Sequence, residues 1–333
     1  MQTSVSRSAP NARTSVWVVV AMMAMIIVPA ALTLSSVRSP ARLEMTADNP
    51  TPYGYTWSLL LFIIPILVIA IGFLPRAEIK IPRRAFWWTI GILAPIGCAT
   101  DFLFASRFFR FEYPGATLQI PAPALDKPVP VEEYIFYVTG FIAVLLIYLW
   151  LDEYWLAKYE EPDYRGESKN IPRLLKFHPL SALLAIGFVI AAVVYKKQFS
   201  SDREGFPEYF TFLVLVGFVP SAAFFPVAKK FVNWRALSLT LFFVLLLSLL
   251  WEATLAVPYK WWGYQPNQML GIKIGAWSDL PIEAVCVWIA VSYTTAIVFE
   301  VTKLWQASGR PAKHAFLGVP TAQMRPLPTT YRS

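Results

Sequence analysis

Two adjacent carboxylates, Glu132 and Glu133, begin an apolar run in the stretch VPVEEYIFYV, which contains no Lys or Arg. The stretch LPIEAVCVWI repeats the Pro-x-Glu pattern with one carboxylate, Glu283, before another apolar run. Two further acids, Asp101 and Glu252, lie near the ends of the preceding apolar runs. Carboxylates inside membrane-spanning segments are costly and typically mark proton relays or binding sites. These five acids are therefore the candidate catalytic residues.

The chemistry open to such acids is proton transfer in an apolar setting. Burial keeps a carboxyl group protonated near neutral pH, and paired carboxyl groups titrate as a unit. One acid can then protonate a carbon–carbon double bond, and a second can remove a proton from the carbocation. Proton-coupled transport needs the same groups. The acids thus predict either carbocation chemistry on a lipid-dissolved alkene or transport.

Aromatic residues crowd the loops that precede the two acidic helices, in SRFFRFEYPG and YKWWGYQP. An aromatic belt at the membrane interface explains part of this enrichment. Rings can also line a site where positive charge develops, and a desolvated cation gains about 2 kcal/mol or more from an aromatic face. We predict that the substrate-binding residues are Phe111, Tyr113, Phe136, Trp262 and Tyr264.

The composition predicts that membrane helices position these residues. Of the 333 residues 56% are hydrophobic and 15% charged, whereas about 25% are charged in soluble domains. We predict an all-α, polytopic membrane bundle of about eight helices, because eight apolar runs are long enough to cross a bilayer. The runs lie near residues 16–36, 56–75, 86–106, 130–151, 179–196, 208–228, 236–256 and 281–304.

An internal repeat relates the two halves of the chain. At an offset of 151 residues, Asp101 aligns with Glu252 and Glu132 with Glu283. Four helices in each half would give both units the same orientation, which is a parallel repeat. The first run also fits a cleaved signal peptide, but the repeat favours a retained helix. We predict a first repeat over 1–155, a cytoplasmic linker over 156–178, a second repeat over 179–307 and a disordered tail over 308–333.

The two neighbouring acids of the first motif cannot both face one cavity, because adjacent helical residues point about 100° apart. Glu132 has a counterpart in Glu283, whereas Ala284 stands opposite Glu133. We therefore predict that Glu132 faces a central cavity and that Glu133 flanks it. The two half-sites should then differ in chemistry. For any one of these acids taken singly, a first-turn residue that faces water is the ordinary alternative.

The net charge of +8 is distributed in a way that favours a membrane partner over nucleic acid. Most of the 29 Lys and Arg residues lie in the tails and the even-numbered connections, which marks that side as cytoplasmic. Anionic lipid headgroups attract such charge. We predict a protein of the cytoplasmic membrane with both termini in the cytoplasm, the bilayer as a partner, and no nucleic acid.

Cofactor and metal signals are weak in this sequence. It contains no Gly-rich phosphate loop and no GxGxxG. Cys98 and Cys286 lie in separate apolar runs without metal-ligand spacing, and His178 and His314 are isolated. We expect no cofactor and no metal. The acids of the longest connection are interpreted as a solvated linker rather than a metal site: Asp152, Glu153, Glu160, Glu161 and Asp163.

Two segments, PVEEYIFYV and WWGYQPNQMLGIKIGAWSDLPIEAVCVWI, resemble motifs of the small integral-membrane lycopene cyclases. The motifs are a Pro-x-Glu-Glu and an upstream W-x-Y…LGI, and the resemblance covers both units, near 56–151 and 208–304. It implies a redox-neutral cyclisation of the ψ end groups of a linear carotene to β-type rings, without a flavin. The five acids occupy the implicated positions. The loop FRFEYPGATLQIPAPALDKP departs from W-x-Y…LGI, and Ala284 replaces a second acid.

The leading hypothesis is therefore an enzyme, a membrane carotenoid cyclase of the isomerase type acting on a lipophilic polyene. A cyclase or hydratase of another isoprenoid is the first alternative. A proton-coupled transporter is the second, since Pro65, Pro95 and Pro220 offer helix breaks, although the acids lie near one interface. A non-catalytic carotenoid-binding or scaffold protein is the third. Contact with other carotenoid-pathway enzymes stays open, as do the substrate, the ring type and the oligomeric state.

Overall fold

The computed structural model describes residues 52–75, 82–160 and 164–318. Within these ranges seven helices are long and apolar enough to cross a membrane, which indicates an integral membrane protein. The prediction of a helical membrane bundle is confirmed at this level. The eighth expected helix, near residues 16–36, lies outside the described residues.

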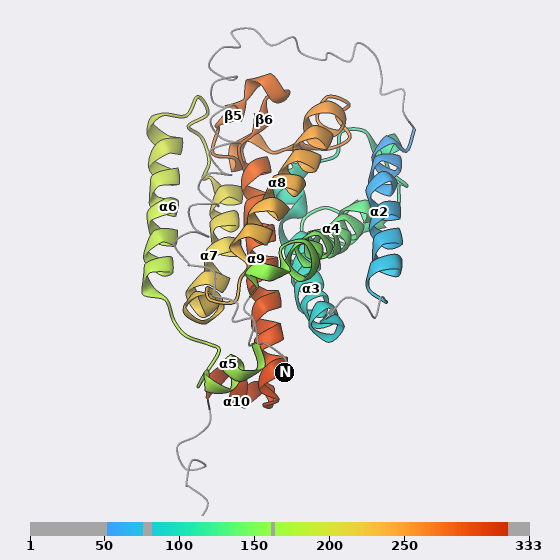
Figure 1. Ribbon diagram of the computed structural model, residues 1–333. Coiled ribbons are helices and arrows are strands. Elements are labelled where there is room, and N and C mark those ends of the chain that lie inside the picture. The colour runs from blue at the N-terminus through green and yellow to red at the C-terminus, as the bar shows by residue number, and fades with distance from the viewer. Residues whose placement is uncertain (1–51, 76–81, 161–163, 319–333) are drawn as a thin grey trace, which may run out of the picture.

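The long helices agree with the predicted runs to within a few residues. They are α2 (Gly54–Phe73), α3 (Arg83–Phe108), α4 (Val131–Trp150), α6 (Pro179–Gln198), α7 (Glu208–Ala228), α8 (Trp234–Trp251) and α9 (Glu283–Ser308). Helices α4 and α8 each continue into a π-helical turn, Leu151–Trp155 and Glu252–Ala256. Two short helices, α5 (Tyr164–Asn170) and α10 (Ala312–Leu317), lie at the end of the molecule where α9 ends (Figure 1).

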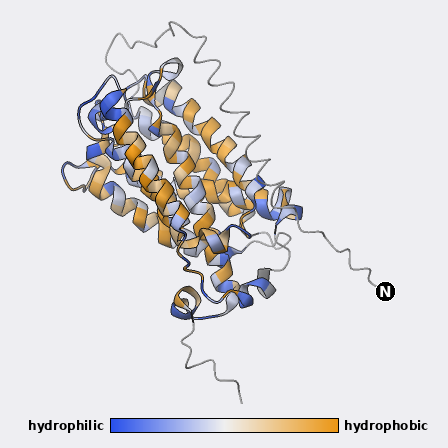
Figure 2. Cartoon of the chain, turned by 90° about the vertical axis from the view of Figure 1, so that its left-hand side faces the viewer, coloured by the Kyte–Doolittle hydropathy of each residue, from blue (hydrophilic) through white to orange (hydrophobic). Residues whose placement is uncertain are grey.

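The outer faces of these helices are as apolar as their inner faces. Leu61 on α2 is 70% exposed and Leu183 on α6 is 64% exposed. A helix that is hydrophobic all round suits a bilayer, where the exposed side chains contact lipid. Figure 2 shows hydrophobic residues along the helices and hydrophilic residues gathered in the connections at both ends.

Helix α9 is the centre of the bundle and packs against α3, α4, α7 and α8 (Figure 1). Helix α6 packs on α7 and α2 packs on α4, on opposite sides of the molecule. Buried residues form two clusters, one around Leu145 and Ile297 and the other around Trp262 and Leu280. The second cluster lies among the loops that precede the acidic helices.

Three short antiparallel ribbons organise these loops. Strand β1 (Phe109–Arg110) pairs with β4 (Gly263–Tyr264), which joins the loop after α3 to the loop after α8. The other ribbons each stand just before a helix that carries an acidic motif. They pair β2 (Pro121–Ala122) with β3 (Val129–Pro130), and β5 (Lys273–Ile274) with β6 (Leu280–Pro281). The ribbons therefore fix where α4 and α9 begin.

The predicted disordered tail differs from the structure at its start. Residues 309–318 are described, and they include α10. The carbonyls of Ala315 and Phe316 accept hydrogen bonds from the amides of Leu174 and Leu175, in the predicted linker. Burial of Leu174 and Ala315 explains the order of both segments. Residues 319–333, where the Pro- and Thr-rich composition is found, lie outside the described residues.

Candidate functional site

A cavity of about 50 Å³ lies where the loops meet helices α2, α4, α7, α8 and α9. Two carboxylates line it, Glu133 on α4 and Glu252 at the start of the π-helical turn after α8. Rings make up most of the remaining wall. They belong to Tyr55, Phe109, Phe136, Tyr137, Phe141, Tyr209, Trp251, Trp262, Tyr264 and Trp288.

Glu133 is a buried acid with one hydroxyl donor and two acidic neighbours, Asp101 and the adjacent Glu132. Its Oε1 accepts a hydrogen bond of 2.5 Å from the Tyr55 hydroxyl. Asp101, on α3, interacts with it electrostatically and is itself 1% exposed. Neither carboxylate oxygen of Asp101 has a hydrogen-bond partner among the described residues. Two neighbouring buried carboxyl groups do not readily carry two charges at once, so at least one of them keeps its proton. This environment suits a proton donor at the cavity.

Glu252 has a different environment, with three donors aimed at its carboxylate. Its Oε2 accepts a hydrogen bond of 2.7 Å from the Tyr264 hydroxyl, and its Oε1 accepts from Ser248 Oγ at 3.0 Å and from Trp288 Nε1 at 3.4 Å. Burial, and next the nearby Glu252 carboxylate, raises the pKa of Tyr264 well above its usual range, so this hydroxyl stays a donor. Hydrogen bonds to a carboxylate favour its charged form. Glu252 therefore suits a proton acceptor.

Replacing Tyr264 by Phe removes one of these donors without emptying the aromatic wall. A hydrogen bond to a charged group contributes about 1.5–3 kcal/mol, so we expect Tyr264→Phe to slow a reaction in which Glu252 accepts a proton by about tenfold or more. Product formation in isolated membranes, with the substrate proposed below, measures the effect. Tyr113→Phe is the matched control, because Tyr113 does not line the cavity. Equal losses in the two variants would contradict the assigned contact.

The structure contradicts the prediction that Glu132 faces the cavity and that Glu133 only flanks it. Glu132 is 1% exposed, but it is not among the residues that line the cavity. Its Oε1 accepts hydrogen bonds from Thr56 Oγ1 at 2.5 Å and from the Leu118 amide at 2.6 Å. Glu132 thus ties the first turn of α4 to the preceding loop and to α2.

Glu283 makes the equivalent contact at the start of α9. Its Oε1 accepts a hydrogen bond of 2.6 Å from the Leu270 amide. The buried Lys196 of α6 interacts with it electrostatically and forms an ion pair of 3.1 Å with Asp202. Glu283 therefore has a loop amide and a nearby cation, and like Glu132 it does not line the cavity. Both aligned glutamates fix loops.

Only part of the predicted aromatic set lines the cavity. Trp262, Tyr264 and Phe136 do so, whereas Phe111 and Tyr113 do not. The pairing of β1 with β4 gives the reason. Phe109 stands opposite Tyr264 in this ribbon, and it is Phe109 that contributes its ring to the cavity.

Several wall residues were not predicted from the sequence. Trp251 stacks on Phe136 at 5.8 Å between ring centroids and on Tyr55 at 6.1 Å, and Trp288 meets Phe136 edge-on at 5.7 Å. Trp251 directly precedes Glu252, so proximity to an acid could have identified it. Tyr55 and Tyr209 come from helices without any acidic motif, and only packing shows their role.

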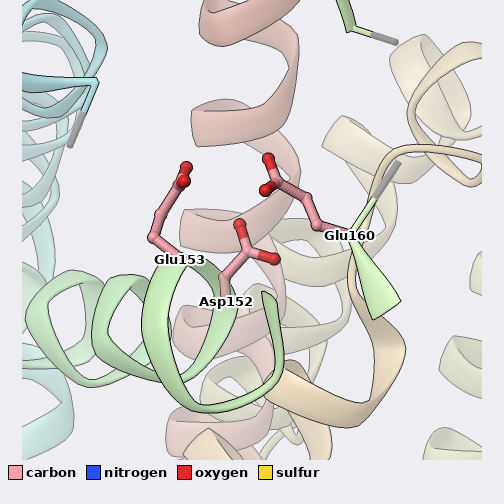
Figure 3. A group of neighbouring side chains, drawn as sticks. All are labelled: Asp152, Glu153 and Glu160. Carbon is pink, nitrogen blue, oxygen red and sulfur yellow. The ribbon is translucent and has the colours of Figure 1, made fainter. Parts of the chain in front are cut away.

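A second group of carboxylates surrounds Lys303, near the other end of α9. Its Nζ lies 3.3 Å from both Asp152 and Glu153, 3.2 Å from Glu160 and 3.5 Å from Glu300. Figure 3 shows the carboxylates of Asp152, Glu153 and Glu160 pointing toward a common space. The side chains of Asp152 and Glu153 are 0% and 7% exposed.

The prediction of a solvated acidic linker is therefore wrong for Asp152, Glu153 and Glu160, because α9 brings a buried ammonium into their midst. Glu161 and Asp163 lie outside the described residues. One oxygen of each of the first three acids falls within 4.8 Å of the others, and carboxylate oxygens are common ligands of divalent cations. In this structure the ammonium supplies the compensating charge, and the group links α4 to α9.

Comparison with known proteins matches the chain to no family model, no curated protein and no solved structure. The resemblance to membrane lycopene cyclases therefore stays a prediction. The two carboxylates, their hydrogen-bond donors and the aromatic wall around them are the features that bear on function.

Proposed function

We propose that this chain is a membrane enzyme that cyclises the end groups of a linear isoprenoid polyene, as the lycopene cyclases do. The observation that carries the proposal is the cavity itself, in which two carboxylates of unlike environment face an aromatic wall. Acids that donate and accept protons, together with rings that stabilise a cation, are what this reaction requires. The apolar outer surface of the helices suits a substrate dissolved in lipid.

The reaction adds one proton to the substrate and later removes one proton from it. Protonated Glu133 donates to the terminal carbon–carbon double bond of the polyene, which leaves a tertiary carbocation and the Glu133 carboxylate. The next double bond attacks this cation, forms the new carbon–carbon bond and closes a six-membered ring. Glu252 then removes a proton from the carbon next to the new cationic centre, and the released electron pair forms the ring double bond. Substrate and product are isomers, so no oxidant or reductant takes part.

The roles of the two acids follow from their neighbours. Glu252 accepts hydrogen bonds from three donors, which favour its charged, proton-accepting form. Glu133 has a single hydroxyl donor and the buried Asp101 beside it. A pair of buried acids retains a proton more readily than one acid surrounded by donors. Asp101 acts in this scheme through Glu133, because a second buried acid nearby disfavours a charge on Glu133 and so keeps its proton in place until it donates.

We also propose that the chain consists of two parallel four-helix units in the cytoplasmic membrane, with both termini in the cytoplasm. Helices α3 and α8 begin 151 residues apart, at Arg83 and Trp234. Glu132 and Glu283 bind the amide of a preceding loop in the same way. In this arrangement Glu133 comes from the first unit and Glu252 from the second. The repeat then builds one acid pair at the junction of the units.

Expression in bacteria that accumulate lycopene tests the function directly. We expect a product of unchanged mass that absorbs at shorter wavelength, because a ring double bond twists out of the polyene plane and shortens the conjugation. Chromatography with mass and absorption detection measures it. Unchanged lycopene, despite confirmed insertion of the protein in the membrane, would overturn the proposed substrate.

A further inference from the structure

The cavity lined by Glu133 and Glu252 is called the acid cavity below. A second cavity, of about 80 Å³, adjoins it between helices α2, α4 and α8. We call it the lateral groove. Phe136, Gly140, Trp251 and Trp288 line both cavities, so only their side chains and backbone separate the two. The remaining residues of the lateral groove are Leu59, Phe62, Ile66, Thr139, Ala143, Val144, Ile147, Val244, Leu247 and Ser248.

The lateral groove is bordered by surfaces that face lipid. On α8, Leu247 lines the groove and is also 49% exposed. On α2, Ile69 lies one turn beyond the groove residue Ile66 and is 47% exposed. In a bilayer these side chains contact hydrocarbon. A hydrocarbon chain can therefore reach the groove sideways, without crossing the polar loops.

The inner end of the lateral groove reaches the proton acceptor. Ser248 lines the groove, and its Oγ donates the hydrogen bond of 3.0 Å to Glu252. Trp288, which lines both cavities, also donates to Glu252. The Glu252 carboxylate and these two donors therefore lie between the groove and the acid cavity. The stacked rings of Phe136 and Trp251 lie between them as well.

The acid cavity is small for the end group of a long polyene, so the substrate needs space beyond it. Its volume is about 50 Å³, which is space for only a few water molecules, since one water needs about 10–15 Å³ of such space. The end group of a long polyene is several times larger than a water molecule. Phe136, Trp251 and Trp288 line both cavities, so a movement of these rings that enlarges the acid cavity also joins it to the groove.

We propose that the lateral groove is the binding site for the unreacted part of a long, linear, unsaturated hydrocarbon, whose end group occupies the acid cavity. This proposal rests on the proposed function for the identity of the end-group reaction. The hydrocarbon enters from the bilayer between α2 and α8, and the rings of Phe136, Trp251 and Trp288 move apart to admit it. The groove then selects long chains, while the acids select where protonation occurs.

Two neighbouring leucines on α8 provide a matched test. Leu247 lines the groove and is 49% exposed, whereas Leu246 does not line it and is 46% exposed. We expect Leu247→Trp to fill the groove and weaken lycopene binding about tenfold or more, and Leu246→Trp to leave binding unchanged. Both changes are made in a Glu133→Gln background, so that bound lycopene does not react. The circular dichroism that lycopene acquires in a chiral site, recorded in lipid nanodiscs, measures binding apart from free lycopene in the lipid.

The outcomes separate this proposal from the proposed function. Equal binding by the two Trp variants, or no induced dichroism with the parent protein, overturns the groove. A different result separates the two proposals. If the parent protein binds lycopene, Leu247→Trp weakens this binding and the wild-type protein forms no rings, the groove proposal stands and only the proposed function is rejected. Should Leu247→Trp fail to insert, Ala143→Leu on α4 blocks the same groove, and unchanged binding in that variant overturns the proposal.

Discussion

Replacing Glu133 by Gln is expected to abolish ring formation, with turnover lower by about 10²–10⁴-fold. Gln has the same shape and can still accept the hydrogen bond from the Tyr55 hydroxyl. It carries no proton that it can give to an alkene, so the first step of the reaction is lost. Product formation by membranes of lycopene-accumulating cells, normalised to the amount of inserted protein, measures the effect.

Glu132→Gln is the matched control, since it makes the same chemical change one residue away. A Gln at this position still offers an oxygen to the Leu118 amide and to Thr56 Oγ1. We therefore expect turnover to stay within a few-fold of wild type. The reverse result, with Glu132→Gln inactive and Glu133→Gln active, would restore the assignment suggested by the repeat and reject the one made from the cavity.

Replacing Lys303 by Met is expected to destabilise the protein by about 3–5 kcal/mol, because it leaves buried carboxylates without their cation. Four acids lie within 3.5 Å of this ammonium, and the side chains of Asp152 and Glu300 are fully buried. Met retains most of the volume, so the loss is electrostatic. Thermal unfolding of the purified protein in detergent or nanodiscs measures it.

Two further variants make this experiment decisive. Lys313→Met removes a charge from an exposed position on α10 and should leave the unfolding temperature nearly unchanged. The double variant Lys303→Met with Asp152→Asn should recover part of the lost stability, because it removes one of the uncompensated charges. If Lys303→Met unfolds at the wild-type temperature, some other cation neutralises the acids. The close approach of Asp152, Glu153 and Glu160 would then be examined as a metal site by adding divalent ions.

The helices were predictable because their signal is local. A run of apolar residues long enough to cross a bilayer identifies a span regardless of its neighbours, and α7 has the same limits, 208–228, as the predicted run. The five acids could also be selected from the sequence, since each is costly at its predicted depth. All five are in fact nearly inaccessible to solvent, with Glu133 the most exposed at 6%.

The sequence did not predict which acids line the cavity and which bind loop amides, because this depends on contacts between distant segments. The repeat aligns Glu132 with Glu283, but their shared role is to bind loop amides. Glu133 has no aligned acid. It lines the same cavity as Glu252 because different helices pack around that cavity. The acids around Lys303 were misjudged for the same reason, since the ammonium lies about 150 residues further along the chain.

The most direct test of whether Glu133 protonates the substrate is to form the product in deuterated water. We expect one deuterium in each new ring, at the carbon that receives the proton, because a buried carboxyl group exchanges its proton with solvent between turnovers. The label should be absent from the ring carbon that forms the new bond. Rings formed without deuterium, or labelled rings formed by the Glu133→Gln variant at the wild-type rate, would show that Glu133 is not the proton donor.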